Sequence, residues 1–234
     1  MRAPLEIAAA QPLTVPSDVA GNALRHADAI RTARTRVVVF PEMSLTGYGF
    51  DARAIGVGDP RLEPIVDACR RTGVIALVGG PVESGGGEPH IAILAIDGEG
   101  VRIAYRKMWL GGAEPDHFRP GTAPAVLEVD GWRLGLAVCK DTGVPQHAAD
   151  TAALGMDAYV AGVLETMADA AVPDERARRV AADHGVWVVI ASFAGSTGGG
   201  FDEAAGGSGI WAADGLAVAR AGIEPGEIVR ATLT

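Results

Sequence analysis

The sequence is poor in cysteine, in basic charge and in long apolar runs, and each scarcity narrows the range of functions. Only two cysteines occur, Cys69 and Cys139, and neither a CxxC nor an HExxH pattern is present. A disulfide framework and a zinc site are therefore not expected, and both thiols should be free. No G-x-G-x-x-G segment follows the first expected strand, which disfavours a dinucleotide cofactor. We expect no metal and no cofactor.

Acidic residues outnumber basic ones, and the net charge is −9. A protein that binds nucleic acid or an anionic membrane by general charge attraction would carry a basic face, so neither partner is expected. No apolar run approaches the roughly 18 residues of a membrane-spanning helix. The segment 1–11 contains Arg2, Pro4 and Glu6 where a signal peptide needs a continuous apolar core. The expected location is the cytoplasm.

Apolar residues are abundant enough to form a large core. The 234 residues are 48% hydrophobic and 21% charged, which is typical of a globular protein. No linker is visible, so residues 1–234 are expected to form one domain. Helical periodicity alternates with short apolar runs, and this alternation predicts an α/β protein with a mixed sheet. Helices are predicted at 17–34 with Ser17 as N-cap, 60–72, 148–154 and 173–183, hairpins at 90–107 and 125–139, and a glycine-rich loop at 195–209.

Three apolar strands each end at a chemically reactive side chain. The first runs into Pro41 and Glu42, the second ends at Lys107, and the third stops at Cys139. Because proline cannot donate to a strand ladder, Glu42 should lie at the mouth of its strand. A lone cysteine is usually a small core residue, which is our interpretation of Cys69 on the apolar stripe of a helix. Cys139 differs because it stands where a buried strand meets a polar loop.

The motifs around these residues resemble those of the nitrilase superfamily, the carbon–nitrogen hydrolases with a Glu-Lys-Cys triad. The sequence contains FPE followed by LTGY, then YRK, then a strand that ends in Cys with Asp two residues later. Their order and intervals are similar to the family's, and the resemblance covers nearly the whole chain. It implies a four-layer αββα sandwich with two mixed sheets, and a homodimer or higher homo-oligomer.

The resemblance also implies roles for the three side chains. Cys139 would be the nucleophile and Glu42 the base that accepts its proton. Lys107 would favour the thiolate and stabilise the oxyanion that forms during attack, with the backbone N–H of Lys140 as the second donor.

Further residues near these motifs are candidates for the site. Glu114 lies in GGAEPDHFRPG, whose F-x-P-G ending resembles a loop of the same family. By that resemblance Glu114 would position substrate or hydrogen-bond Lys107, and could relay protons to leaving ammonia. Two interpretations of Tyr48 stay open, since it either lines the pocket or packs against its turn. Asp141 is expected to cap the loop after the nucleophile through its side chain.

The chain departs from the family pattern at several positions. Lys140 stands where an aromatic residue is common and places a second cation near the site. The segment 164–172 lacks the proline and aromatic residues of many relatives. Residues 182–185 are Ala-Asp-His-Gly, and they lack the acid–asparagine pair that many relatives carry in this helix. Transfer of a substrate from any one subfamily is therefore unsafe.

The leading hypothesis is a cofactor-independent hydrolase that cleaves a non-peptide carbon–nitrogen bond, most simply in a small amide, through a thioester acyl-enzyme. Hydrolysis of a nitrile or an N-carbamoyl compound is the alternative within the same fold. From a different functional class, a catalytically weak scaffold or binding subunit that retains the fold also stays open, because of Lys140 and the altered later segments.

Overall fold

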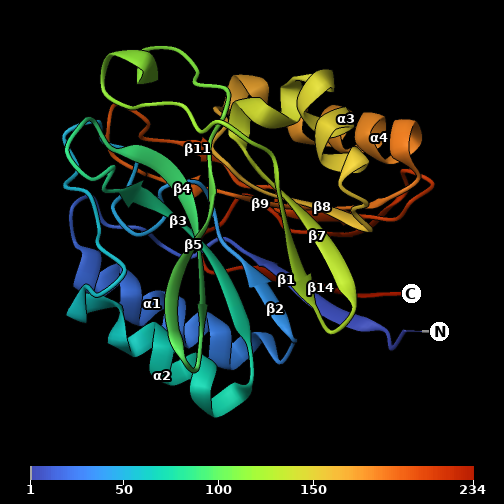
Figure 1. Ribbon diagram of the computed structural model, residues 1–234, viewed down its shortest axis with the longest axis horizontal. Coiled ribbons are helices and arrows are strands. Elements are labelled where there is room, and N and C mark those ends of the chain that lie inside the picture. Colours follow the sequence, from blue (N-terminus) through green and yellow to red (C-terminus); the bar gives the residue numbers. More distant parts are fainter. Residues whose placement is uncertain (1) are drawn as a thin grey trace.

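The computed structural model describes residues 2–234 and has four layers, in which two β-sheets lie face to face between two layers of helices (Figure 1). Each large sheet has six strands, in the orders β14-β1-β2-β3-β4-β5 and β13-β12-β9-β8-β7-β6. Both sheets mix parallel and antiparallel pairs, as β1-β2-β3 and β7-β8-β9 are parallel and the outer pairs are antiparallel. The αββα sandwich expected from the sequence is confirmed.

The first sheet is covered on its outer face by two helices, α1 (Val19–Ala33) and α2 (Glu63–Thr72). Its central strands are apolar on both faces, as expected for parallel strands buried on both sides. The antiparallel pair of β1 and β14 places the two chain ends at the same edge of the molecule (Figure 1). The strands are β1 (Leu5–Ala10), β2 (Val37–Val39), β3 (Ile75–Val82), β4 (His90–Asp97), β5 (Gly100–Arg106) and β14 (Ile228–Leu233).

The second sheet is covered by α3 (Pro145–Ala153) and α4 (Val172–His184). Its strands are β6 (Ala125–Val129), β7 (Trp132–Val138), β8 (Ala158–Val163), β9 (Trp187–Ser192), β12 (Gly209–Trp211) and β13 (Ala217–Arg220). Short elements join these, namely the 3-10 turns η1 (Pro60–Leu62), η2 (Glu114–Asp116), η3 (Cys139–Gly143) and η4 (Met167–Asp169), and the small pair β10 (Ala194–Gly195) and β11 (Ala204–Ala205).

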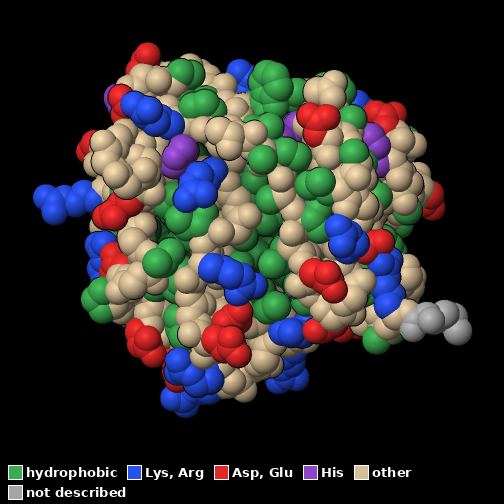
Figure 2. Space-filling model, in the orientation of Figure 1, with side chains coloured by type: hydrophobic (Ala, Val, Ile, Leu, Met, Phe, Trp, Pro, Cys, Tyr) green, Lys and Arg blue, Asp and Glu red, His purple; other side chains and the backbone are tan. Residues whose placement is uncertain are grey.

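Apolar side chains form one layer between the two sheets and a further layer beneath each pair of helices. Among residues 2–234, no helix combines the length and apolar character needed to cross a bilayer. On the face seen in Figure 2, acidic and basic side chains are interspersed and neither sign dominates.

Three local predictions were wrong in detail. The N-cap of α1 is Asp18, whose side chain accepts the Gly21 N–H at 2.9 Å, because Ser17 adopts a positive φ of 62° outside the helix. Helix α3 begins at Pro145, three residues earlier than expected, since proline suits the first position of a helix. The predicted loop 195–209 contains β11, which pairs with β10.

Two glycines hold the end of β2 between the sheets. A Cβ built on Gly79 of β3 would lie 2.3 Å from the carbonyl oxygen of Pro41, and one on Gly162 of β8 would lie 2.6 Å from that of Phe40. Side chains do not approach backbone this closely, so both positions require glycine. The segment that carries Glu42 is therefore clamped from both sides by backbone.

We expect Gly162→Ala to destabilise the protein, because the added methyl group would overlap the backbone of the segment after β2. The free energy of unfolding should fall by about 1–3 kcal/mol, as is usual for overpacking. Urea denaturation followed by circular dichroism measures this. Gly58→Ala is the matched control, since a Cβ there meets nothing within 4 Å. Equal stability of the two variants would contradict the clamp.

Candidate active site

The structure brings together the three side chains that follow strand ends. Glu42 lies just beyond β2, Lys107 directly follows β5, and Cys139 directly follows β7. The first two strands belong to one sheet and β7 belongs to the other, so the site forms where strand ends of facing sheets meet.

A single ammonium group joins two carboxylates. Lys107 Nζ donates to Glu42 Oε1 at 2.7 Å and to Glu114 Oε1 at 2.8 Å, and each of the three residues is only 1% exposed. Burial lowers the pKa of Lys107, but attraction to Glu42, Cys139 and Glu114 outweighs it, so the pKa lies above its usual value. Lys107 is therefore a permanent buried cation. Its ion pairs with the two carboxylates offset the cost of burying the charge.

Glu42 is able to exchange a proton near neutral pH. Burial raises its pKa, attraction to Lys107 lowers it and repulsion from Glu114 raises it, with a result of about 7. Its second oxygen, Oε2, is buried and has no hydrogen-bond partner at bonding distance among residues 2–234. The Cys139 thiol is close enough to lower the pKa of Glu42. A buried acceptor left open beside a thiol is suited to take its proton.

Cys139 sits in a strained turn at the start of η3. Its φ of 42° is in the left-handed region, which is costly for a residue with a side chain. Its Sγ lies 3.5 Å from the carbonyl oxygen of Leu164. Cys139 lies one residue beyond Val138, the last residue of β7, so it is outside the strand ladder.

Lys107 lowers the pKa of the Cys139 thiol, which is the expected direction, but other effects are larger. Burial raises the pKa of the Cys139 thiol and repulsion from Glu42 raises it further, whereas Lys107 lowers it by less. The pKa therefore lies above its usual value and the resting thiol is protonated. Attack must be coupled to proton transfer to a base.

Asp141 fastens the turn that carries the thiol. Its carboxylate accepts hydrogen bonds from the Val138 N–H at 2.9 Å, the Tyr105 hydroxyl at 2.8 Å and the Trp109 N–H at 2.9 Å. The predicted capping role is confirmed. Because Tyr105 and Trp109 flank Lys107, the same carboxylate fixes the nucleophile's turn relative to the lysine. Sequence reasoning missed Tyr105, and also His147, which bonds the Tyr105 hydroxyl at 2.8 Å.

Glu114 is held by donors on both oxygens. Besides Lys107, Oε1 accepts the Tyr48 hydroxyl at 2.5 Å, and Oε2 accepts the Gly111 N–H at 2.7 Å. Burial, with the nearby Glu42 and Glu114, raises the pKa of Tyr48, so it remains a neutral donor. Of the two interpretations of Tyr48, the structure shows its side chain in the wall of the site.

A cavity of about 390 Å³ lies beside these groups. Its lining includes the thiol, Lys107, Glu114 and several aromatic and glycine residues. The full set is Tyr48, Phe50, Lys107, Gly111, Gly112, Ala113, Glu114, Cys139, Lys140, Gly199 and Phe201. Among residues 2–234, no three His, Cys, Asp or Glu side chains are arranged to hold a metal ion.

A charged pair near the thiol was missed by sequence reasoning. Glu165 follows the end of β8, and its Oε1 lies 3.0 Å from a guanidinium nitrogen of Arg176. Glu165 follows Leu164, whose carbonyl oxygen lies 3.5 Å from Cys139 Sγ, and its charge raises the pKa of the thiol. Its position after a buried strand is the signal that could have identified it, since Glu42 occupies the same kind of position.

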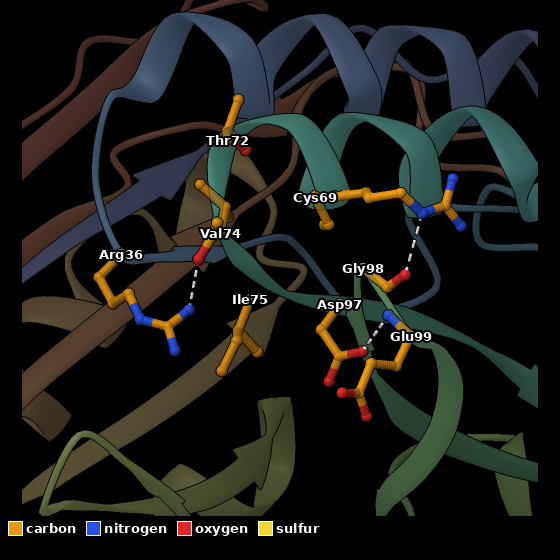
Figure 3. A pocket seen from close by; sticks show the side chains of 10 residues that line it. Arg36, Cys69, Thr72, Val74, Ile75, Asp97, Gly98 and Glu99 are labelled. Carbon is orange, nitrogen blue, oxygen red and sulfur yellow. Dashed lines mark hydrogen bonds between the residues drawn. The ribbon is translucent and has the colours of Figure 1, made fainter.

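A larger cavity of about 840 Å³ lies elsewhere and lacks these reactive groups (Figure 3). It is formed by the start of β3 and the β4–β5 turn, at the opposite ends of the strands from the site. Its charged groups bond locally, since Arg36 donates to the Gly73 carbonyl and Asp97 accepts the Glu99 N–H at 2.9 Å (Figure 3). Cys69, whose thiol is buried, also lines it, but neither of the chain's two lysines does.

Comparison with known proteins supports one family. The family model for carbon–nitrogen hydrolase matches residues 6–234. A hydrolase encoded in the pqqF 5′ region of Pseudomonas protegens is 31% identical over 227 residues, which are 92% of this chain and 78% of that protein. An (R)-stereoselective amidase of a Pseudomonas species is 31% identical over 149 residues, which are 61% of this chain and 54% of the amidase.

A solved structure agrees with the sequence matches. The NitN amidase from Nesterenkonia sp. AN1 superposes with a TM-score of 0.88 at 25% identity, over 98% of this chain and 93% of that one. A variant of the same amidase carries acrylamide added at its active-site cysteine. By its sequence, its fold and the matched family model, this chain belongs to the carbon–nitrogen hydrolase family, the nitrilase superfamily of enzymes.

Proposed function

We propose that the protein hydrolyses a small amide through a thioester on Cys139, with Glu42 as base, Lys107 as electrostatic catalyst and Glu114 as its support. The observation that carries this proposal is the buried Oε2 of Glu42, which has no hydrogen-bond partner among residues 2–234. Its Oε1 bonds Lys107, and Lys107 and Cys139 line the same cavity. The amidase names of two relatives support an amide over a nitrile or a carbamoyl compound.

In the first step, Glu42 accepts the thiol proton as sulfur attacks the carbonyl carbon. The π electron pair of the carbonyl moves onto oxygen, and the resulting oxyanion is stabilised by Lys107 Nζ and the backbone N–H of Lys140. Lys140 lies in the first turn of η3, where backbone N–H groups have no partner within the helix. The strained φ of Cys139 fixes the sulfur relative to these donors.

In the second step, the protonated Glu42 gives its proton to the amide nitrogen as the carbon–nitrogen bond breaks. Ammonia leaves and the acyl group remains on sulfur as a thioester. Water then attacks the thioester, Glu42 takes its proton, and the released thiolate recovers a proton from Glu42 as the carboxylic acid departs. Glu114 holds Lys107 in place throughout and forms no covalent bond with the substrate.

The proposal predicts that Cys139 becomes acylated during turnover. Incubation with a small amide such as propionamide should add the acyl mass to the peptide that contains Cys139, as measured by mass spectrometry. Cys139→Ala should reduce ammonia release to the uncatalysed background. Cys69→Ala, which removes the other thiol at a buried site outside the cavity, is the control and should stay active. Unchanged turnover by Cys139→Ala would exclude a thioester, and complete inactivity of the unaltered protein would favour the scaffold alternative.

The pKa of Glu42 predicts the pH dependence of catalysis. A base must be ionised to accept a proton, and burial holds the pKa of Glu42 at about 7. The value of kcat/KM should therefore decline as pH falls below about 7, one decade per pH unit. Glu42→Gln should lower kcat/KM by about 10²- to 10⁴-fold and abolish this decline at low pH. A decline that persists in Glu42→Gln would assign the titration to another group.

The expected homodimer or higher assembly and the cytoplasmic location stay predictions. Light scattering after size-exclusion chromatography measures the first.

A further inference from the structure

We propose that Lys140 selects substrates that carry a carboxylate a few bonds from the scissile amide. This inference rests on the proposed function and adds a substrate class to it. It assigns the Lys140 side chain a task separate from that of its backbone N–H.

Lysine is rare in this chain and confined to the site. Only two of the 20 lysine and arginine residues are lysines, Lys107 and Lys140. Both line the same cavity of about 390 Å³. Lys107 is buried and donates two of its three N–H groups to Glu42 and Glu114, which leaves one donor for the oxyanion and none for a second charged group on the substrate.

The ammonium of Lys140 is the cation of the cavity wall whose free donors the proposed reaction does not use. It makes no ion pair within residues 2–234, and Nζ donates one hydrogen bond, to the carbonyl oxygen of Leu110 at 2.8 Å. A lysine ammonium has three N–H donors, so two remain for a ligand. Its residue is exposed, which leaves it accessible to a molecule entering from solvent. The other nearby cation, Arg176, is paired with Glu165.

The loop before Glu114 directs the Lys140 side chain. A Cβ built on Gly111 would lie 3.4 Å from Lys140 Cδ and 3.9 Å from Glu114 Oε2, so the lysine stem passes along Gly111 close to the buried carboxylate. Consecutive Cα atoms are about 3.8 Å apart, so Lys140 is anchored within one residue of the nucleophile. An acid only a few bonds from the amide carbonyl can therefore meet the ammonium while the carbonyl meets the thiol.

The remaining wall of the cavity offers nothing that would favour a cationic substrate. Glu114 has both oxygens occupied by donors, and Glu42 is buried and does not line the cavity. The other side chains include the aromatic Phe50 and Phe201. Because the whole protein carries a charge of −9, an anionic substrate is repelled overall and needs a local cation to bind. Lys140 supplies that cation.

The test compares matched anionic and neutral amides. Malonamate, succinamate and glutaramate are each paired with the amide in which a methyl ketone replaces the carboxylate, for example 4-oxopentanamide for succinamate. Selectivity is the ratio of kcat/KM for the two members of a pair, measured by ammonia release. Because each ratio is taken within one protein, any effect of a substitution on the oxyanion donor cancels.

We expect the unaltered protein to prefer at least one anionic member by about tenfold or more. Lys140→Met should reduce that ratio by about 10- to 100-fold, the range for a hydrogen bond to a charged group, chiefly through KM. Lys140→Arg should restore part of the preference. A preference left unchanged by Lys140→Met, or equal turnover of both members by the unaltered protein, would overturn the proposal. Equal loss on both substrates would mean that Lys140 only fastens the loop at Leu110.

Binding to an inactive protein separates this proposal from the proposed function. In Cys139→Ala, calorimetry should detect succinamate binding that weakens with rising ionic strength and is lost when Lys140→Met is added. If succinamate binds in this way but no amide is hydrolysed by the unaltered protein, the proposed function fails and the anion site stands. If amides are hydrolysed but succinamate binding is unchanged by Lys140→Met, the anion site is wrong and the proposed function stands.

Discussion

The structure depends on one buried ammonium group held between two carboxylates. Placing Lys107 in the interior is costly unless its charge is met by good hydrogen bonds, and Glu42 and Glu114 supply these at 2.7 and 2.8 Å. One positive and two negative charges share this small volume. Burial and the second glutamate raise the pKa of Glu42 to about 7, although Lys107 lowers it.

The fold explains why these charges meet. Glu42 and Lys107 leave strands of one sheet and Cys139 leaves a strand of the other, and the glycines at 79 and 162 let the segment of Glu42 pass between the sheets. The carboxylate of Asp141 then ties the turn of Cys139 to the residues that flank Lys107. Strand ends and backbone hydrogen bonds thus position Glu42, Lys107 and Cys139, while Glu114 and most of the cavity wall come from connecting segments.

Much of this arrangement could be predicted from the sequence, because the signals are local. A proline that ends a strand, a charge directly after an apolar run and a capping aspartate each act within a few residues. The resemblance to the family's motifs predicted further features, including the hydrogen bond between Glu114 and Lys107. The choice of Asp18 over Ser17 as N-cap depended on one backbone angle that no periodicity encodes.

Long-range features were not predictable in the same way. The need for glycine at 162 appears only when the two sheets face each other, and the need at 79 only when the segment after β2 lies against β3. Tyr105 and His147 have no local signature, since their hydrogen bonds join segments far apart in the sequence. The protonated state of the Cys139 thiol also depends on burial, which outweighs the attraction of Lys107 that the motif suggested.

The central claim is that Glu42 exchanges its proton near neutrality because it is buried and lies beside a second glutamate that shares Lys107. A carbon-13 NMR titration of labelled glutamate carboxyl groups tests this directly, with Glu42→Gln used to assign the signal. The account predicts a carboxyl that titrates at about pH 7 and disappears in that variant. A Glu42 signal that titrates near the ordinary value of a glutamate, about 4.3, would contradict it.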